Sequence, residues 1–233
     1  YKPLFYLLAT LVPVVATAQK QSTLDIARQY VEQHRDRWAL TPADIAGFHV
    51  GDHYQTQHNG VTHIYFRQQH AGMAINGATL GVHVAPDGQV AFATCTFVAD
   101  AAAYINATTP TLSAFEAVRR AAAHLGLSLT ENLEIVDATG KTEVILSEGG
   151  IARRPIRTRL VYQPTGEKTL RLAWDLAIDH RHSADYWSLR IDAVTGDLLE
   201  KGNFTLYCRP GEQLRHFHKT PCFEPPGDRP PEW

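Results

Sequence analysis

The amino-acid sequence shows the same order of elements twice, one helix followed by a run of short strands. The first occurrence covers residues 24–98 and the second covers residues 114–206. Because helix and strands are grouped rather than alternating, this order favours an α+β fold with antiparallel sheets over a parallel α/β fold. We therefore predict two consecutive lobes, each a helix packed on an antiparallel sheet, with a boundary between residues 99 and 110.

The first half is predicted to be one helix and an antiparallel meander. Apolar residues recur every three to four positions over residues 24–38, after Ser22 or Thr23 as the helix N-cap. Asn59-Gly60 separates the first two extended stretches and is the strongest hairpin signal in the chain. Alternation and turn residues predict strands over residues 52–58, 61–70, 79–85 and 89–98.

The second half begins with a clearer helix signal. Ser113 and Glu116 form a capping-box pattern, and Gly126 stands where a left-handed C-cap is expected, which predicts a helix over residues 114–125. Strand patterns follow over residues 133–137, 142–147, 157–163, 170–179, 186–192 and 197–206.

The charge of the chain gives no reason to expect a polyanionic partner. Lys plus Arg number 22 against 24 for Asp plus Glu, a formal net charge of −2. Nucleic acid is therefore not predicted as a partner, and neither is an anionic membrane.

The first eighteen residues have the pattern of a secretory signal peptide. Lys2 gives the basic start, residues 4–15 the apolar run, and Ala16-Thr17-Ala18 an A-x-A cleavage site, with Ala16 and Ala18 as the cleavage residues. An apolar run of this length is too short to span roughly 30 Å of hydrocarbon as a helix. We expect a secreted, extracellular protein that passes through the periplasm if it is bacterial, with no membrane association in its mature form.

The C-terminal stretch, residues 208–233, differs in kind from the rest. Periodicity ends at Cys208 and prolines accumulate, so we expect a proline-rich linker or tail. The chain has three cysteines, Cys95, Cys208 and Cys222, and this odd number is too few for a disulfide framework. Cys208 and Cys222 either close a small disulfide loop or stay free thiols.

No catalytic signature is found in the sequence. None of the twelve histidines is followed by Glu, so the H-E-x-x-H pattern that builds a metallopeptidase helix is absent. Serine-hydrolase, phosphate-loop and dinucleotide-binding motifs are absent as well. We therefore predict no catalytic residues, no cofactor and no enzymatic activity for this chain.

Two clusters have side chains of metal-ligand type. The first is a predicted polar connection between strands, a solvated loop more often than a metal site, with Asp179, His180, His182 and Asp185. The second, in the tail, has weak candidate ligands whose spacing fits no common zinc pattern, Cys208, His216, His218 and Cys222. One of these thiols or imidazoles could instead cap the zinc of a protease in trans, which would make the tail a switch.

Three stretches together resemble a known family. They are residues 59–66 with 75–80, the helix over residues 111–127, and residues 172–178 with 186–196. The first resembles the fungalysin/thermolysin propeptide domain, and the others resemble the PepSY domain that usually follows it in fungalysin-type zinc metallopeptidases. On this basis residues 19–106 are assigned to the first domain and residues 107–207 to the second, between the signal peptide 1–18 and the tail 208–233.

The resemblance implies two cystatin-like lobes that assist the folding of a protease and block its cleft. The implied partner is a metallopeptidase catalytic domain, in cis or in trans, and it would hold the zinc. By position, the stretch after the last strand is expected to make the inhibitory contact, with residues Asn203, Phe204, Thr205, Leu206, Tyr207 and Cys208. Two alternatives stay open: an N-terminal fragment of a precursor whose downstream domain is a zinc metalloendopeptidase, and a stand-alone secreted PepSY-like binding module.

Overall fold

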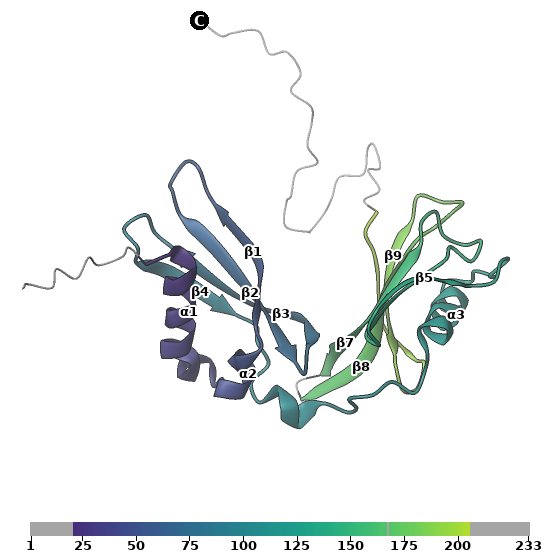
Figure 1. Ribbon diagram of the computed structural model, residues 1–233, viewed down its shortest axis with the longest axis horizontal. Helices are drawn as coiled ribbons and strands as arrows, with labels where there is room; N and C mark the ends of the chain where they lie inside the picture. The colour runs from purple at the N-terminus through teal and green to yellow at the C-terminus, as the bar shows by residue number, and fades with distance from the viewer. Residues whose placement is uncertain (1–20, 167, 206–233) are drawn as a thin grey trace, which may run out of the picture. The chain divides into compact units, whose positions relative to one another are not determined.

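A computed structural model of the chain describes residues 21–166 and 168–205 (Figure 1). These residues divide into two compact units. The first contains residues 21–71 and 77–100, and the second contains residues 72–76 and 101–205. Each unit has its own helix and antiparallel strands, so the predicted α+β class is confirmed.

The elements of the first unit are α1 (Thr23–His34), the 3-10 helix η1 (Arg35–Trp38), α2 (Pro42–Ala46), β1 (His49–Gln55), β2 (Thr62–His70), β3 (Met73–Val84) and β4 (Val90–Cys95). Those of the second are η2 (Ala101–Tyr104), α3 (Ala114–His124), β5 (Ile135–Thr139), β6 (Glu143–Leu146), β7 (Ile156–Gly166), β8 (Thr169–Asp179), β9 (Tyr186–Asp192) and β10 (Leu198–Asn203). In the described part of the chain, none of the helices has the length and apolar character needed to span a membrane.

Helix α1 starts as predicted and ends earlier than predicted. The Ser22 hydroxyl accepts from the backbone N–H of Asp25 at 3.1 Å and caps the first turn. The α-helix stops at His34, and the last turn tightens into η1 because Ala39 takes a left-handed conformation (φ 54°) and donates its N–H to the carbonyl of Asp36. This turn leads the chain to Leu40, which is buried.

Helix α2 is absent from the sequence prediction. Thr41 and Asp44 form a reciprocal capping box, with Pro42 at the first helical position. The Asp44 carboxylate also accepts from the N–H of Asp100 at 2.9 Å. This buried side chain therefore joins the start of α2 to the end of the first unit.

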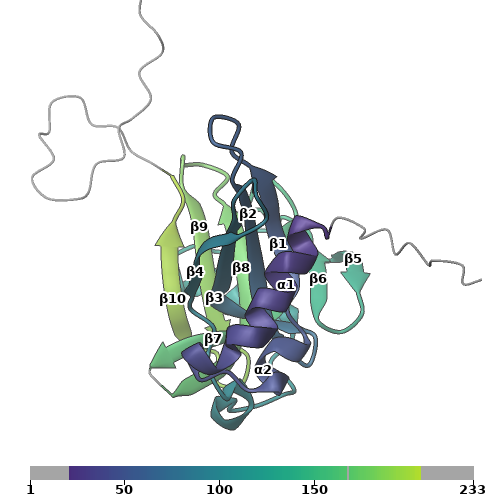
Figure 2. The same ribbon diagram turned by 90° about the vertical axis from the view of Figure 1, so that its left-hand side faces the viewer.

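The strands of the first unit lie in the order β1-β2-β3-β4. Helix α1 contacts β2 and β4 and lies over one face of this sheet (Figure 2). The apolar residues that alternate along β2 and β3 are fully buried: Ile64, Phe66, Leu80, Val82 and Val84. Polar and aromatic side chains alternate with them and point to the opposite face.

The first two hairpins of this sheet differ in their turns. Asn59-Gly60 lies in the connection between β1 and β2 as predicted, but the connection spans residues 56–61, with Gly60 at φ 68°. Ala71 and Gly72 join β2 to β3, both with positive φ, as a two-residue hairpin turn of the I′ type requires. Strand β3 therefore begins at Met73, well before the predicted residue 79.

Helix α3 matches its prediction closely. The N–H of Ser113 donates to the Glu116 carboxylate at 2.8 Å, and Ser113 accepts from the N–H of Glu116 at 3.3 Å. Gly126 has the expected left-handed conformation (φ 69°). The buried stripe of the helix faces β8, β9 and β10 and consists of Ala114, Ala117, Val118, Ala121 and Ala122.

The second sheet is mainly antiparallel. Pairing runs from β5 through β6, β7, β8 and β9 to β10, and the first part of β3 adds a parallel contact through Ile75 and Tyr162. Trp174 on β8 is 2% exposed and donates its indole N–H to the carbonyl of Leu112 at 2.9 Å. This bond ties the approach to α3 onto the sheet.

Candidate functional site

The end of β10 is the place where the sequence predicts contact with a partner, and we call residues 203–205 the exit segment. The backbone N–H of Phe204 donates to the carbonyl of Tyr186 at 2.8 Å. The Asn203 amide accepts from the N–H of Tyr186 at 3.2 Å and donates to the Asp185 carboxylate at 2.7 Å. The amide oxygen and the amide nitrogen of Asn203 are thus both hydrogen-bonded within the second unit.

In the rest of the exit segment, the Thr205 side chain is bonded to the fold and the Phe204 side chain is exposed. The Thr205 hydroxyl donates to the carbonyl of Ala184 at 2.5 Å and accepts from the N–H of Tyr186 at 3.1 Å. The Phe204 ring packs edge-on against Tyr186 with 5.5 Å between centroids, yet Phe204 is 60% exposed. The two polar side chains thus anchor the segment, whereas the Phe204 side chain is largely exposed to solvent.

Strand β10 offers a second feature suited to binding. Within residues 21–166 and 168–205 it pairs with β9 and with no other strand, so it forms an edge of the second sheet. Glu200, Lys201 and Gly202 are exposed along this edge. An edge strand has free backbone donors and acceptors that can pair with an extended segment of another protein.

The structure reaches only part of the residues predicted for function. Asn203, Phe204 and Thr205 lie together at the exit segment, and their inhibitory contact stays a prediction. Outside the described residues lie the other three predicted contact residues, both signal-cleavage residues and the tail ligand candidates: Leu206, Tyr207, Cys208, Ala16, Ala18, His216, His218 and Cys222.

The polar loop between β8 and β9 makes internal bonds. Asp179 pairs with Arg154 at 3.0 Å and lies 3.8 Å from Arg153. The Nδ1 atom of His180 lies 2.6 Å from the Ser183 hydroxyl, which donates to the Asp185 carboxylate at 2.7 Å. Across the described ranges, no group of three or more His, Cys, Asp or Glu residues is placed to hold a metal ion.

Sequence reasoning missed the residues that hold the exit segment. Ala184 and Tyr186 supply backbone atoms, and Arg154 places its guanidinium carbon 5.5 Å from the centroid of the Tyr186 ring. Backbone partners leave no residue-type signal, so only the pairing of β9 with β10 could have located them. Asp185 was noticed in the sequence, but as a candidate metal ligand rather than as the partner of Asn203.

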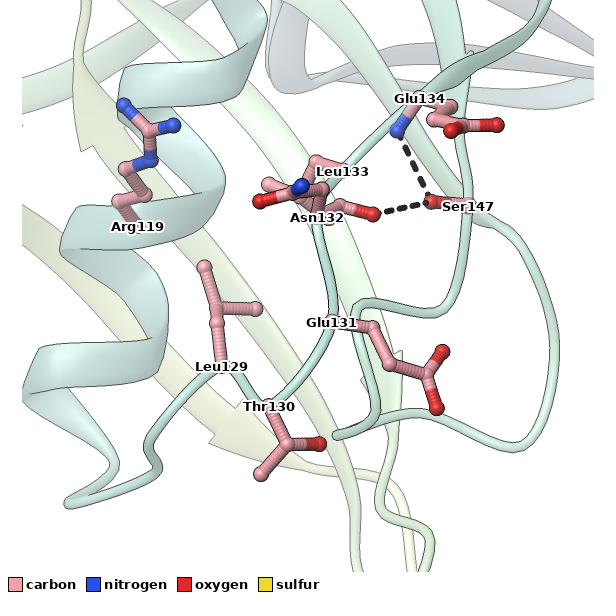
Figure 3. A pocket seen from close by; sticks show the side chains of 8 residues that line it. All are labelled: Arg119, Leu129, Thr130, Glu131, Asn132, Leu133, Glu134 and Ser147. Carbon is pink, nitrogen blue, oxygen red and sulfur yellow. Dashed lines mark hydrogen bonds between the residues drawn. The ribbon is translucent and has the colours of Figure 1, made fainter.

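A separate open hollow of about 680 Å³ lies between α3 and the start of β5 (Figure 3). Two hydroxyl side chains line it, Thr130 and Ser147. Ser147 accepts from the N–H of Glu134 at 2.9 Å and donates to the carbonyl of Asn132 at 3.4 Å. Glu131 lies 3.6 Å from Arg181. The printed bonds of Ser147 are thus to backbone atoms, which hold the start of β5 against the loop after β6.

Comparison with known proteins points to protease precursors. Residues 46–97 match the family model described as Fungalysin/Thermolysin Propeptide Motif. An extracellular metalloproteinase, mep, from Aspergillus niger is 33% identical over 184 residues, which is 78% of this chain and 27% of that protein. Extracellular metalloproteinase mep from Aspergillus fumigatus is 28% identical over 190 residues, with 78% and 28% covered. The chain thus spans about a quarter of the length of these relatives.

Among solved structures, the chain is similar to the Bacillus megaterium YpeB C-terminal domain. The TM-score is 0.37 with 13% identity, covering 82% of this chain and 68% of that one.

The propeptide motif matched by residues 46–97 begins at the end of α2 and ends two residues beyond β4, so it contains the whole sheet of the first unit. The resemblance to a fungalysin-family propeptide region is confirmed by this motif and by the curated relatives.

Proposed function

On the premise that the chain contains the fungalysin/thermolysin propeptide motif, we propose that it is the non-catalytic propeptide region of a secreted zinc metalloendopeptidase of the fungalysin type. In this role it assists folding of the catalytic domain and inhibits it until cleavage. The match of residues 46–97 to a propeptide model is the observation that carries the proposal. The catalytic domain, in cis or in trans, is the partner and holds the zinc.

The exit segment supports the inhibitory part of this proposal. A protease cleft accepts an extended backbone, and β10 delivers such a backbone from an anchored edge of a folded unit. Anchoring at Asn203 and Thr205 lowers the entropy that an inhibitory segment loses on binding. In cis, the tether adds a high effective concentration.

Secretion belongs to the same proposal. The curated relatives are named extracellular metalloproteinases, and the N-terminal signal pattern of the sequence agrees with export. We assign residues 107–207 to a PepSY-like domain that places the exit segment, and no catalytic residue to either unit.

The direct test adds the purified chain to an active fungalysin-type peptidase and measures residual hydrolysis. We expect dose-dependent inhibition, and we expect removal of residues 203–233 to spare folding but abolish inhibition. Undiminished inhibition by the truncated chain would remove the exit segment and tail from the mechanism. No inhibition by either chain, with both folded by circular dichroism, would count against the inhibitory role.

A single substitution sharpens this test. Because Phe204 is 60% exposed, Phe204→Ala should leave stability nearly unchanged. A buried aromatic anchor at an interface is worth about 2 kcal/mol or more, so the inhibition constant should rise at least about tenfold. Ile135→Ala is the matched control, since Ile135 is 58% exposed on β5 and is not part of the exit segment.

A further inference from the structure

A row of rings crosses the sheet of the first unit on the face opposite α1. It contains one residue from each strand: Tyr54, His63, His83 and Phe92. Tyr54 pairs with His63 in the β1–β2 register, and His83 pairs with Phe92 in the β3–β4 register. Ring centroids lie 5.0 Å apart for Tyr54 and His63, 4.7 Å for the two histidines, and 3.9 Å for His83 and Phe92.

The two imidazoles in the middle of this row are hydrogen-bonded to each other. Nδ1 of His63 lies 2.6 Å from Nδ1 of His83, and Nε2 of His63 lies 2.8 Å from the Thr56 hydroxyl. A contact between two ring nitrogens needs one proton between them, so one ring donates and the other accepts. One added proton fits this arrangement, because His63 can then donate at both nitrogens, to His83 and to Thr56.

A second proton does not fit. It would have to sit on Nδ1 of His83, and two N–H groups would then point at each other with two positive charges in contact. His83 is only 4% exposed, so water cannot relieve this repulsion without movement of the ring. The row must open when both imidazoles are charged.

The surroundings of the pair contain little opposing charge. On this face β1 contributes Asp52 and Tyr54, and β2 contributes Tyr65 and Arg67. Asp52 is paired with Arg67 at 3.1 Å and so is already partly neutralised. The pKa of Tyr65 is raised, first by its hydrogen bond with Tyr54, so Tyr65 is uncharged near neutral pH. On β4 the ring of Phe92, itself uncharged, covers His83.

We propose that the His63–His83 pair is an acid-sensitive latch of the first unit, closed when the two imidazoles share one proton between their Nδ1 atoms and opened when both are protonated. This regulatory device does not depend on the proposed function, because its effect falls on the stability of the first unit itself. It adds an acid response to a sheet whose other face is held by α1.

The sign of the effect follows from the buried member of the pair. Burial, and then the nearby charge of His63, lowers the pKa of His83 below its ordinary value of 6.5. The unfolded chain therefore takes up this proton before the folded chain does. The contribution of the closed pair to the stability of the first unit is therefore fully present above pH 6.5, and it is lost as the pH falls from 6.5 towards the lower pKa of folded His83. Because one proton is involved, the folding constant falls by at most about tenfold per pH unit.

The test is urea unfolding of the purified chain, followed by circular dichroism between about pH 8 and pH 5. We expect the first-unit midpoint to be constant above pH 6.5 and to fall below it. His83→Asn keeps a hydrogen-bonding group near the Nδ1 position but does not titrate, so most of the fall should disappear. His53→Asn, at an exposed histidine of β1, is the matched control and should keep it.

Three outcomes would overturn the latch. The first is an unchanged pH dependence in His83→Asn. The second is a pH dependence that vanishes when EDTA is present, which would replace the shared proton by a bound metal ion. The third applies even if the variant does not fold: an NMR titration of the wild-type chain that places the His83 ring pKa at or above 6.5.

Discussion

Asp192 shows how much a single buried carboxylate can organise in this chain. It is fully buried at the end of β9, forms an ion pair with Arg171, and accepts from the backbone N–H groups of Val194 and Thr195, both at 2.8 Å. One side chain therefore neutralises a cation and closes the turn that leads to Gly196, at φ 82°. Its role is structural, because every bond it makes is internal to the second unit.

Replacing Asp192 should be costly for this reason. Asp192→Ala leaves the Arg171 charge and two backbone donors without their partner, and we expect the free energy of unfolding to fall by about 3 kcal/mol. Asp197→Ala is the control: this exposed carboxylate accepts from the Thr195 hydroxyl at 2.7 Å, and its loss should cost less than about 1 kcal/mol. Urea denaturation measures both, and equal losses would contradict the special position of Asp192.

Asn203 is the residue that should couple stability to inhibition. Asn203→Ala removes the bonds to Asp185 and Tyr186, and we expect a loss of about 1–2 kcal/mol in the second unit. Inhibition should weaken as well, because Phe204 is no longer held in place. The exposed Asn132 on the approach to β5 gives the control, Asn132→Ala, with an expected change within about 0.5 kcal/mol. Full inhibition by a destabilised Asn203→Ala chain would show that the anchor has no functional part.

At the scale of elements, the sequence predicted best the helices and strands whose signals come from neighbouring residues and extend over many positions. Helix α3 was found because capping box, apolar stripe and C-cap glycine agree. Helix α2 was missed although Thr41 and Asp44 form a capping box, because a five-residue helix is too short to show periodicity. The start of β3 was missed because Gly77, at φ 75°, interrupts the alternation of the strand.

The candidate site was harder to predict than the fold. The position of the exit segment follows from the strand pattern, so Asn203, Phe204 and Thr205 could be singled out. Their anchoring could not, because it depends on backbone atoms of Ala184 and Tyr186 that only the pairing of β9 with β10 brings close. The contact between His63 and His83 was not predicted for the same reason, because it depends on the register in which β2 and β3 pair.

Gly77 gives a prediction that belongs to strand β3 as a whole. It lies where the strand passes from residues of the second unit to residues of the first. A Cβ there would meet no atom within 4 Å, so Gly77→Ala tests backbone strain alone, and the left-handed conformation should cost about 1–2 kcal/mol. Gly202→Ala in β10 also meets no atom but is not in a left-handed conformation, and it should cost nothing measurable. Thermal unfolding of both variants compares them, and equal melting temperatures would contradict the strain.

At the scale of the whole molecule, the two units differ in how they should respond to acid. The His63–His83 pair lies in the first unit, whereas the second is held by ion pairs of arginine with Asp175, Asp179 and Asp192. None of these ion pairs contains a histidine, so they lack the two-imidazole contact that acid is proposed to open. Acidification to about pH 5 should therefore weaken the first unit selectively.

The tryptophans allow this difference to be measured. Trp38 reports on the first unit, and Trp174 and Trp187 report on the second. Near pH 5 we expect urea unfolding monitored by fluorescence to separate into two transitions, with the one at lower urea missing its signal in a Trp38→Phe variant. Near pH 7.5 the two should overlap. A single transition at both pH values, with a midpoint that shifts between them, would contradict selective weakening of the first unit. It would mean that the two units unfold cooperatively, because strand β3 contributes residues to both. Loss of the His63–His83 contact would then lower the stability of the whole chain.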